Sequence, residues 1–143
     1  MIIYIGADHR GYDLKKQIKA HLGNKGYEVV DLGNTVLDLK DDYPDFAKLV
    51  AEAVSKEPES RGILICGSGA GVAIVANKFK GIRAGLAVSP EHARMIRNDE
   101  DNNILTLSAQ LTAADEAVAI VDIFLETPFS IEERHRRRVD KIE

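Results

Sequence analysis

The stretch GILICGSGAG, Gly62 to Gly71, indicates the fold class of this chain. Its first half, up to Cys66, is an apolar run too short for a helix, and its second half is a glycine-rich loop. Such a run is typical of a strand that is buried on both faces. A helical pattern follows from Val72 to Phe79. Strand, loop and helix in this order form one unit of a parallel α/β sheet.

The same alternation continues in both directions along the chain. Short apolar runs predict strands, and apolar residues at helical spacing predict helices. The predicted strands are 2–5, 27–32, 62–66, 82–88 and 104–107, and the predicted helices are 14–22, 46–54, 72–79, 90–97, 113–125 and 130–142. Parallel strands need helical crossovers and bury both faces. We therefore expect one α/β domain, 1–143, with a five-stranded, mainly parallel sheet of undetermined strand order.

Composition limits the classes of function. A chain of 143 residues with 45% hydrophobic content suits one core. The formal net charge of −4 argues against a general binder of nucleic acid or membrane surfaces. A single cysteine cannot form an internal disulfide, and the N-terminal apolar run is too short for a signal peptide. We expect a soluble, cytoplasmic protein with neither nucleic acid nor membrane as a partner.

The glycine loop lies where open α/β sheets bind ligands, beyond the carboxyl end of a strand. Its amides can point into a concavity, and the dipole of the following helix favours an anion. However, Val72 stands where a dinucleotide loop has a third glycine or alanine, and no acidic residue follows about twenty positions later. Gly6 to Gly11 has the spacing of a Walker loop but lacks its lysine. The loop favours an anion without matching a nucleotide motif.

Cys66 stands at the start of this loop. A thiol near a helix start ionises more readily than free cysteine, and the thiolate is a usable base or nucleophile. The alternative, that Cys66 is a small buried apolar residue at a strand end, stays open.

Two further candidate groups follow or precede predicted elements. Asp8 and His9 follow the first strand, where a carboxylate and an imidazole could handle the hydroxyl protons of a sugar. The alternative is that Asp8 only caps a helix and His9 is solvated. The run DDYPDFA, residues 41–47, also fits a capped helix start with Pro44 in the first turn.

The C-terminal tail places cations on one face of a helix. Arg134, Arg138 and Lys141 have the spacing i, i+4 and i+7. Guanidinium groups are preferred partners of phosphate oxygens. The alternative is a solvated basic face, balanced by the acidic residues of the same segment.

Several motifs occur together in one order: GADHRGYDLK, DYPDFA, GILICGSGAGVAIVANKFKGIRA, NNIL and RHRRRV. With them the chain resembles, over nearly its whole length, the sugar-phosphate isomerases that comprise type B ribose-5-phosphate isomerase and the galactose-6-phosphate isomerase subunits. The resemblance implies a Rossmann-like three-layer sandwich with a C-terminal helical tail, no metal or cofactor, and aldose–ketose interconversion through an enediolate. It implies ribose 5-phosphate and ribulose 5-phosphate as the substrate pair. A hexose 6-phosphate, another sugar phosphate, or a non-catalytic binding module are the alternatives.

The resemblance also implies roles for individual residues. Cys66 would be the base that moves a proton between carbons 1 and 2, with Asp8 as a second catalytic group. The amides expected to stabilise the enediolate oxygens are those of Gly67, Ser68, Gly69, Ala70 and Gly71. His9 would contact the sugar or its phosphate, Tyr43 would border the site, and Asn103 would hold a hydroxyl.

The resemblance further implies a homodimer or a dimer of dimers with shared sites. The tail, residues 130–143, would reach the partner subunit, where Arg134 and Arg138 would bind the phosphate of the substrate.

One segment departs from the family pattern. Arg97 to Asn103 reads RNDEDNN, where ribose-5-phosphate isomerases of this type usually have Arg-x-His-Asn-x-x-Asn. Asp99 stands at the position of the histidine that helps to open the sugar ring, Glu100 replaces the asparagine, and Gln110 stands where many members have an arginine. An ordinary aspartate is ionised at neutral pH and cannot donate a proton. We expect Asp99 to be catalytic but to make ring opening the weak step.

Overall fold

The computed structural model describes residues 1–142. Strands and helices alternate in the order β1 (Ile2–Ala7), α1 (Tyr12–Asn24), β2 (Glu28–Asp31), α2 (Tyr43–Lys56), β3 (Arg61–Cys66), α3 (Ala70–Ala76), β4 (Ala84–Leu86), α4 (Pro90–Glu100), β5 (Ile104–Ser108), α5 (Ala114–Glu126) and α6 (Glu133–Asp140). Every predicted strand and helix is present. The main differences are the short β4 and the late start of α6.

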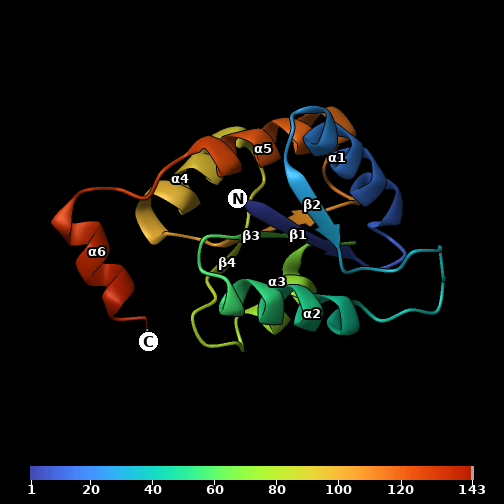
Figure 1. Cartoon of the computed structure of the whole chain (residues 1–143), viewed down its shortest axis with the longest axis horizontal. Coiled ribbons are helices and arrows are strands. Elements are labelled where there is room, and N and C mark those ends of the chain that lie inside the picture. Colours follow the sequence, from blue (N-terminus) through green and yellow to red (C-terminus); the bar gives the residue numbers. More distant parts are fainter. Residues whose placement is uncertain (143) are drawn as a thin grey trace.

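All five strands are parallel, in the order β2-β1-β3-β5-β4. Helices α1, α4 and α5 cover one face of the sheet, and α2 and α3 cover the other (Figure 1). The prediction of a three-layer α/β sandwich is therefore confirmed. Strand β3 is central, and its register pairs Ile65 with Ala7 of β1 and Cys66 with Ser108 of β5. The carboxyl ends of these three strands meet at one edge of the sheet.

Each face of the sheet carries its own apolar layer. Along β3, Ile63 and Ile65 pack with α1 and α5, whereas Leu64 and Cys66 pack with α2 and α3. This alternation follows from the two-residue period of a strand. Cys66 therefore belongs to the α2 and α3 side, with its thiol at the rim of that layer.

Helix α6 belongs to neither apolar layer and lies beside α4, away from the sheet (Figure 1). Its connection to α5 contains Ile131, which is 95% exposed. The backbone amide of Ser130 donates to the carbonyl oxygen of Asn98 on α4, at 3.0 Å. Within residues 1–142, no helix has the length and apolar character needed to cross a membrane.

Candidate active site

A cavity of about 440 Å³ opens at the carboxyl edge of the sheet. Three connecting loops and the start of α2 and α3 line it, with Asp8, Arg10, Tyr43, Cys66, Gly67, Ser68, Gly71 and Gln110. A second cavity of about 450 Å³ shares Asp8 and Tyr43 with the first and adds His9. The structure therefore brings the predicted base, the glycine loop, Asp8, His9 and Tyr43 to one place.

Cys66 is the last residue of β3 and is 4% exposed. The amide of Gly69 donates a hydrogen bond to its Sγ atom at 3.2 Å. Such a bond is strongest when the sulfur carries a charge, and the thiolate is the form that can remove a proton. The sulfur thus lies at the mouth of the cavity with one backbone donor already directed at it.

Two hydroxyl groups of β5 fix the glycine loop from below. Thr106 Oγ1 donates to the carbonyl oxygen of Gly69 at 2.8 Å, and Ser108 Oγ donates to that of Gly67 at 2.7 Å. Both hydroxyl-bearing residues are buried. These bonds take up carbonyl groups of the loop and set the direction of its peptide planes.

The loop amides differ in what they already bind. Gly69 N–H donates to Cys66 Sγ, and Ala70 N–H donates to Ser68 Oγ at 3.2 Å. Gly67, Ser68 and Gly71 are the loop residues that line the cavity. Of the five loop amides, those of these three residues are therefore the ones that can bind a ligand in the cavity.

Glycine is required at two positions of the loop. Gly69 has φ of +74°, and a Cβ atom there would lie 2.7 Å from Leu86 Cδ1 and 2.8 Å from the carbonyl carbon of Leu107. At Gly71 a Cβ atom would lie 2.7 Å from the Tyr43 ring. The absence of side chains lets the loop lie on β5 and lets Tyr43 lie against the start of α3.

We expect Gly69→Ala to lower the free energy of unfolding by about 3 kcal/mol, through backbone strain and overpacking. Gly81→Ala is the matched control, because Gly81 has φ of +79° but nothing within 4 Å of its Cβ position. It should cost only about 1 kcal/mol, the price of the left-handed backbone. Urea unfolding measures both, and equal losses would show that the contact with β5 is not limiting.

Asp8 is 7% exposed, and its Oδ1 atom accepts hydrogen bonds from the amides of Arg10 at 3.0 Å and Gly11 at 3.2 Å. It thus caps the turn that leads into α1, as the structural alternative proposed. It also lines both cavities. The capping bonds hold the carboxylate in place and leave its second oxygen for a ligand.

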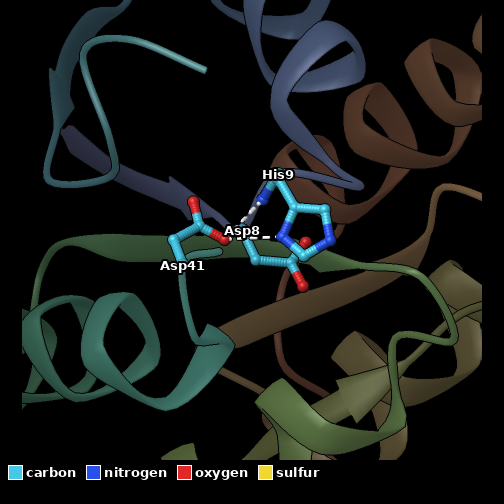
Figure 2. A group of neighbouring side chains, drawn as sticks. All are labelled: Asp8, His9 and Asp41. Atoms are coloured by element: carbon cyan, nitrogen blue, oxygen red, sulfur yellow. Dashed lines mark hydrogen bonds and ion pairs between the residues drawn. The ribbon is translucent and has the colours of Figure 1, made fainter. Parts of the chain in front are cut away.

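His9 is paired with a residue from the loop before α2. Its Nδ1 atom lies 2.7 Å from Asp41 Oδ1 (Figure 2). This hydrogen bond is the main cause that raises the pKa of His9, and the charges of Asp8 and Asp41 act in the same direction. Burial and the charge of Arg10 lower the pKa but do not reverse the shift. The ring is therefore biased towards its cationic form.

Asp8, His9 and Asp41 place ligand-type atoms within 4.8 Å of one another, a spacing that a metal ion could use. In the structure, however, His9 Nδ1 and Asp41 Oδ1 bind each other directly. Asp8 Oδ1 is taken by two backbone amides. These bonds account for the arrangement of the cluster, and the expectation of a site without metal stays a prediction.

Four of the predicted site residues lie elsewhere in the same chain, and three of them contact other side chains or backbone groups there. Asn103 precedes β5, at the amino edge of the sheet, where its Oδ1 accepts from Arg83 N–H at 2.9 Å and its Nδ2 donates to Gly81 O at 2.8 Å. Asp99 lies near the end of α4, with Oδ1 3.9 Å from Nε2 of His135 on α6. Arg134 forms an ion pair with Glu132 at 2.6 Å. Within one chain, none of these residues lines the cavity at Cys66.

The remaining predicted phosphate ligand, Arg138, lies near the end of α6 and is exposed. Within residues 1–142, its side chain forms no ion pair. Arg134 and Arg138 therefore share a helix, but no substrate cavity of the same chain reaches it. The fit of both to a partner's site stays a prediction.

Two residues of the site were missed by the sequence analysis. Arg10 is the only cation among residues 1–142 that lines the Cys66 cavity, and its Nη1 atom lies 3.4 Å from Gln110 Oε1. Asp41 binds His9. The signal for Arg10 was its place directly after Asp8 and His9, and the signal for Asp41 was the acidic run before α2.

Known proteins resemble the chain over nearly its whole length. A family model described as Ribose/Galactose Isomerase matches residues 3–142. A protein of Mycoplasma genitalium, described as probable ribose-5-phosphate isomerase B, is 48% identical over 141 residues, which are 98% of this chain and 92% of that protein. Ribose-5-phosphate isomerase B of Escherichia coli is 41% identical over 140 residues, 98% of this chain and 93% of that protein.

Solved structures give the same result. The crystal structure of ribose-5-phosphate isomerase B from Mycoplasma genitalium with bound ribulose-5-phosphate superposes with a TM-score of 0.95 at 48% identity, covering 99% of this chain and 93% of that one. The corresponding enzyme of Clostridium thermocellum gives 0.95 at 46% identity, covering 99% and 95%. With the family model matching nearly every residue and the thiol and glycine loop in one cavity, this chain belongs to the ribose/galactose isomerase family.

Proposed function

We propose that this protein interconverts ribose 5-phosphate and ribulose 5-phosphate through an enediolate. The observation that carries the proposal is the Cys66 thiol, which meets the glycine loop and Asp8 in one cavity. The chain is also 48% identical to an enzyme whose crystal structure holds ribulose-5-phosphate. A thiol placed in the cavity favours an enzyme over a binding module. A hexose 6-phosphate remains the alternative substrate, since the family also includes galactose isomerases.

In the proposed mechanism, Cys66 removes the proton from carbon 2 of the open-chain aldose and returns it to carbon 1. Negative charge develops on the oxygens of carbons 1 and 2, where the amides of Gly67, Ser68 and Gly71 stabilise it. A preorganised donor of this kind typically lowers a barrier by about 3 kcal/mol. Asp8 carries the hydroxyl proton from oxygen 2 to oxygen 1, so that the product is a neutral ketose with all protons accounted for.

Ring opening is assigned to Asp99, which lies outside the single-chain cavity, and to Asp8, which lines it. Asp99 accepts the proton of the anomeric hydroxyl. The ring oxygen needs a proton as well, which Asp8 relays from solvent water. Ribulose 5-phosphate cannot close to a furanose, so that this step affects only the aldose direction.

The active site is proposed to be shared in a homodimer or a dimer of dimers in the cytoplasm. Helix α6 lies outside both apolar layers, and Ile131 just before it is 95% exposed. A helix that packs in neither apolar layer of its own chain can instead pack on another subunit. The partner subunit would bring Arg134 and Arg138, which lie on α6, and Asp99, which lies on α4, to the cavity.

An isomerisation assay over a panel of pentose and hexose phosphates tests the proposed function. Ribose 5-phosphate should give the highest kcat/KM, with ribulose 5-phosphate as the product. Faster turnover of a galactose phosphate would assign the hexose alternative. Binding of sugar phosphates without turnover of any of them would assign a binding module.

We expect Arg138→Ala to raise KM for the sugar phosphate about tenfold with little change in kcat, because a lost charge-assisted contact to a non-reacting phosphate weakens binding. Arg134→Ala should have a smaller effect, since Arg134 must first leave Glu132. Arg136→Ala is the control, because Arg136 is exposed on the same helix but two residues away from each of them. If all three variants have the KM of the wild type, α6 is a solvated basic face that does not bind phosphate.

Subunit mixing tests whether the site is shared. At substrate concentrations well below KM, a mixture of the Cys66→Ala and Arg138→Ala variants should gain activity after subunit exchange, because a mixed dimer contains one site with both residues intact. The activity of the mixture should exceed the sum of the activities that the two variants show separately. Mass spectrometry demonstrates that the subunits have exchanged. If activity does not rise after that exchange, both residues belong to the site of one chain.

A further inference from the structure

A single carboxylate oxygen holds both the backbone and the ring of His9. Asp41 Oδ1 accepts from His9 N–H at 2.9 Å and lies 2.7 Å from His9 Nδ1. The Asp41 side chain is only 7% exposed. Two bonds to one acceptor fix the position of the residue and the torsion of its ring, so that Nε2 points away from Asp41 (Figure 2).

The other oxygen of Asp41 is held by Asn34, whose Nδ2 atom donates to Oδ2. Asn34 is in turn held by Lys15, whose Nζ atom donates to its backbone oxygen at 2.7 Å and to its Oδ1 atom at 3.3 Å. Lys15 is 1% exposed and also pairs with Asp31 at 3.1 Å. A buried cation therefore orients the Asn34 amide, and that amide orients the carboxylate that binds His9.

This arrangement decides which ring nitrogen carries the proton. An ionised carboxylate can only accept, so that Nδ1 must be the protonated nitrogen in its bond to Asp41. In the neutral ring, Nε2 is then a bare acceptor. Only the imidazolium has an Nε2–H group to donate. Among residues 1–142, Nε2 has no hydrogen-bond partner, which leaves it for a ligand.

Several charged groups surround the ring. Asp8 and Arg10 flank it on its own segment, and Asp41, Asp42 and Asp45 face the same cavity from the loop and from the start of α2. Of these, only Asp41 is hydrogen-bonded to His9. The surrounding charge is mostly negative, which favours the cationic form of the ring in the absence of a bound anion.

We propose that Asp41 is a positioning residue, which fixes His9 so that its Nε2–H group donates to the phosphate of the substrate. The proposal rests on the proposed function, because it names the phosphate of that substrate as the ligand. Asn34 and Lys15 belong to the same device, since they hold Asp41 in its place. Phosphate binding by His9 is then lost when pH rises through the raised pKa of His9, because the neutral ring offers no donor.

Nitrogen-15 NMR of the histidine rings tests the first step without any substrate. In the wild type, the neutral His9 ring should be the Nδ1–H tautomer, with a pKa above the ordinary value of about 6.5. Asp41→Asn keeps the shape but removes the charge, and should lower that pKa. Asp38→Asn is the control, because it makes the same charge change at an exposed position of the same loop. It should leave the His9 pKa in place.

Inorganic phosphate, followed by the His9 ring signals, tests the second step. Wild-type affinity should fall as pH rises through the His9 pKa, and in Asp41→Asn the fall should begin at lower pH. Between the two pKa values, the dissociation constant of the variant should exceed that of the wild type about tenfold, because the neutral ring of the variant has lost its charge-assisted bond to phosphate. At pH below both pKa values, and at pH above both, the two proteins should have the same dissociation constant for phosphate. A merely structural role would weaken binding equally at every pH.

An Nε2–H tautomer in the neutral wild type, an unchanged His9 pKa in Asp41→Asn, or a pH-independent loss of affinity would each overturn the proposal. If Asp41→Asn does not fold, the wild-type tautomer still decides, together with Asp41→Glu, which keeps the charge and should keep the pKa raised. If the wild type isomerises no sugar phosphate, the proposed function fails, and the phosphate titration still decides the role of Asp41. Isomerisation with negative NMR results would overturn the role of Asp41 alone.

Discussion

Cys66→Ala is expected to reduce kcat/KM for ribose 5-phosphate by about 10²- to 10⁴-fold, the range typical of a lost general base. Its thiol is the only sulfur that the described part of the chain, 1–142, places in the cavity, and the hydrogen bond from Gly69 directs it at the loop amides. Asp8 is the carboxylate that lines the same cavity, but two backbone amides already bind one of its oxygens. Isomerisation assays from both directions, with circular dichroism at matched concentration, measure the effect.

Cys66→Ser separates chemistry from packing. Serine keeps the size of the side chain and an acceptor for the Gly69 amide, but its hydroxyl ionises far less readily than a thiol. Both variants should therefore lose activity to a similar extent, while unfolding by urea changes little. Near-normal kcat in Cys66→Ala, with an unchanged fold, would show that another group removes the proton from carbon.

The sheet could be predicted because its strands are buried on both faces and therefore read as continuous apolar runs. Strand β4 covers only part of its apolar run, 82–88, and side chains bind the backbone at its first residues. Asn77 binds both backbone groups of Ala84, through Oδ1 at 2.8 Å and Nδ2 at 2.9 Å, and Asn103 Oδ1 accepts from Arg83 N–H. Hydropathy cannot distinguish such bonds from strand pairing.

The late start of α6 has a similar cause. Ser130 N–H donates to Asn98 O, and Ser130 Oγ accepts from Glu132 N–H at 3.0 Å. These bonds dock the segment on α4 and delay the first helical turn. Because the partners are distant in sequence, a local pattern of charged residues predicts the helix but not its first residue.

The candidate site was predictable where strand topology alone decides. Asp8 and Cys66 follow or end neighbouring parallel strands, so that they must meet at the carboxyl edge. By the same rule, Asn103 precedes β5 and lies at the amino edge, which its place in the sequence already indicated. The pair of His9 and Asp41 joins residues on either side of a long loop, and no periodicity reports such a contact.

Arg10→Ala is expected to lower kcat/KM for ribose 5-phosphate about 10- to 100-fold, mainly through KM. Arg10 is the only cation among residues 1–142 that lines the Cys66 cavity, and its guanidinium lies over the glycine loop, with Cδ 2.8 Å from the Cβ position of Gly67. Among the described residues, 1–142, the only hydrogen bond from its side chain is the 3.4 Å contact with Gln110, so that its other donors are left for an anion. A charge-assisted bond to phosphate contributes about 1.5–3 kcal/mol, which corresponds to this loss.

Arg94→Ala is the matched control, because Arg94 is 49% exposed and pairs with Glu91 on α4. It should leave KM unchanged. Arg10→Lys should fall between Arg10→Ala and the wild type, since lysine keeps the charge but not the planar fork. Turnover of unphosphorylated ribose, where detectable, should be equal in all four proteins, because the missing phosphate removes the partner of Arg10. A fall in kcat at constant KM would instead show that Arg10 stabilises the enediolate. If neither kcat nor KM changes, His9 and the arginines of the tail bind the phosphate without Arg10.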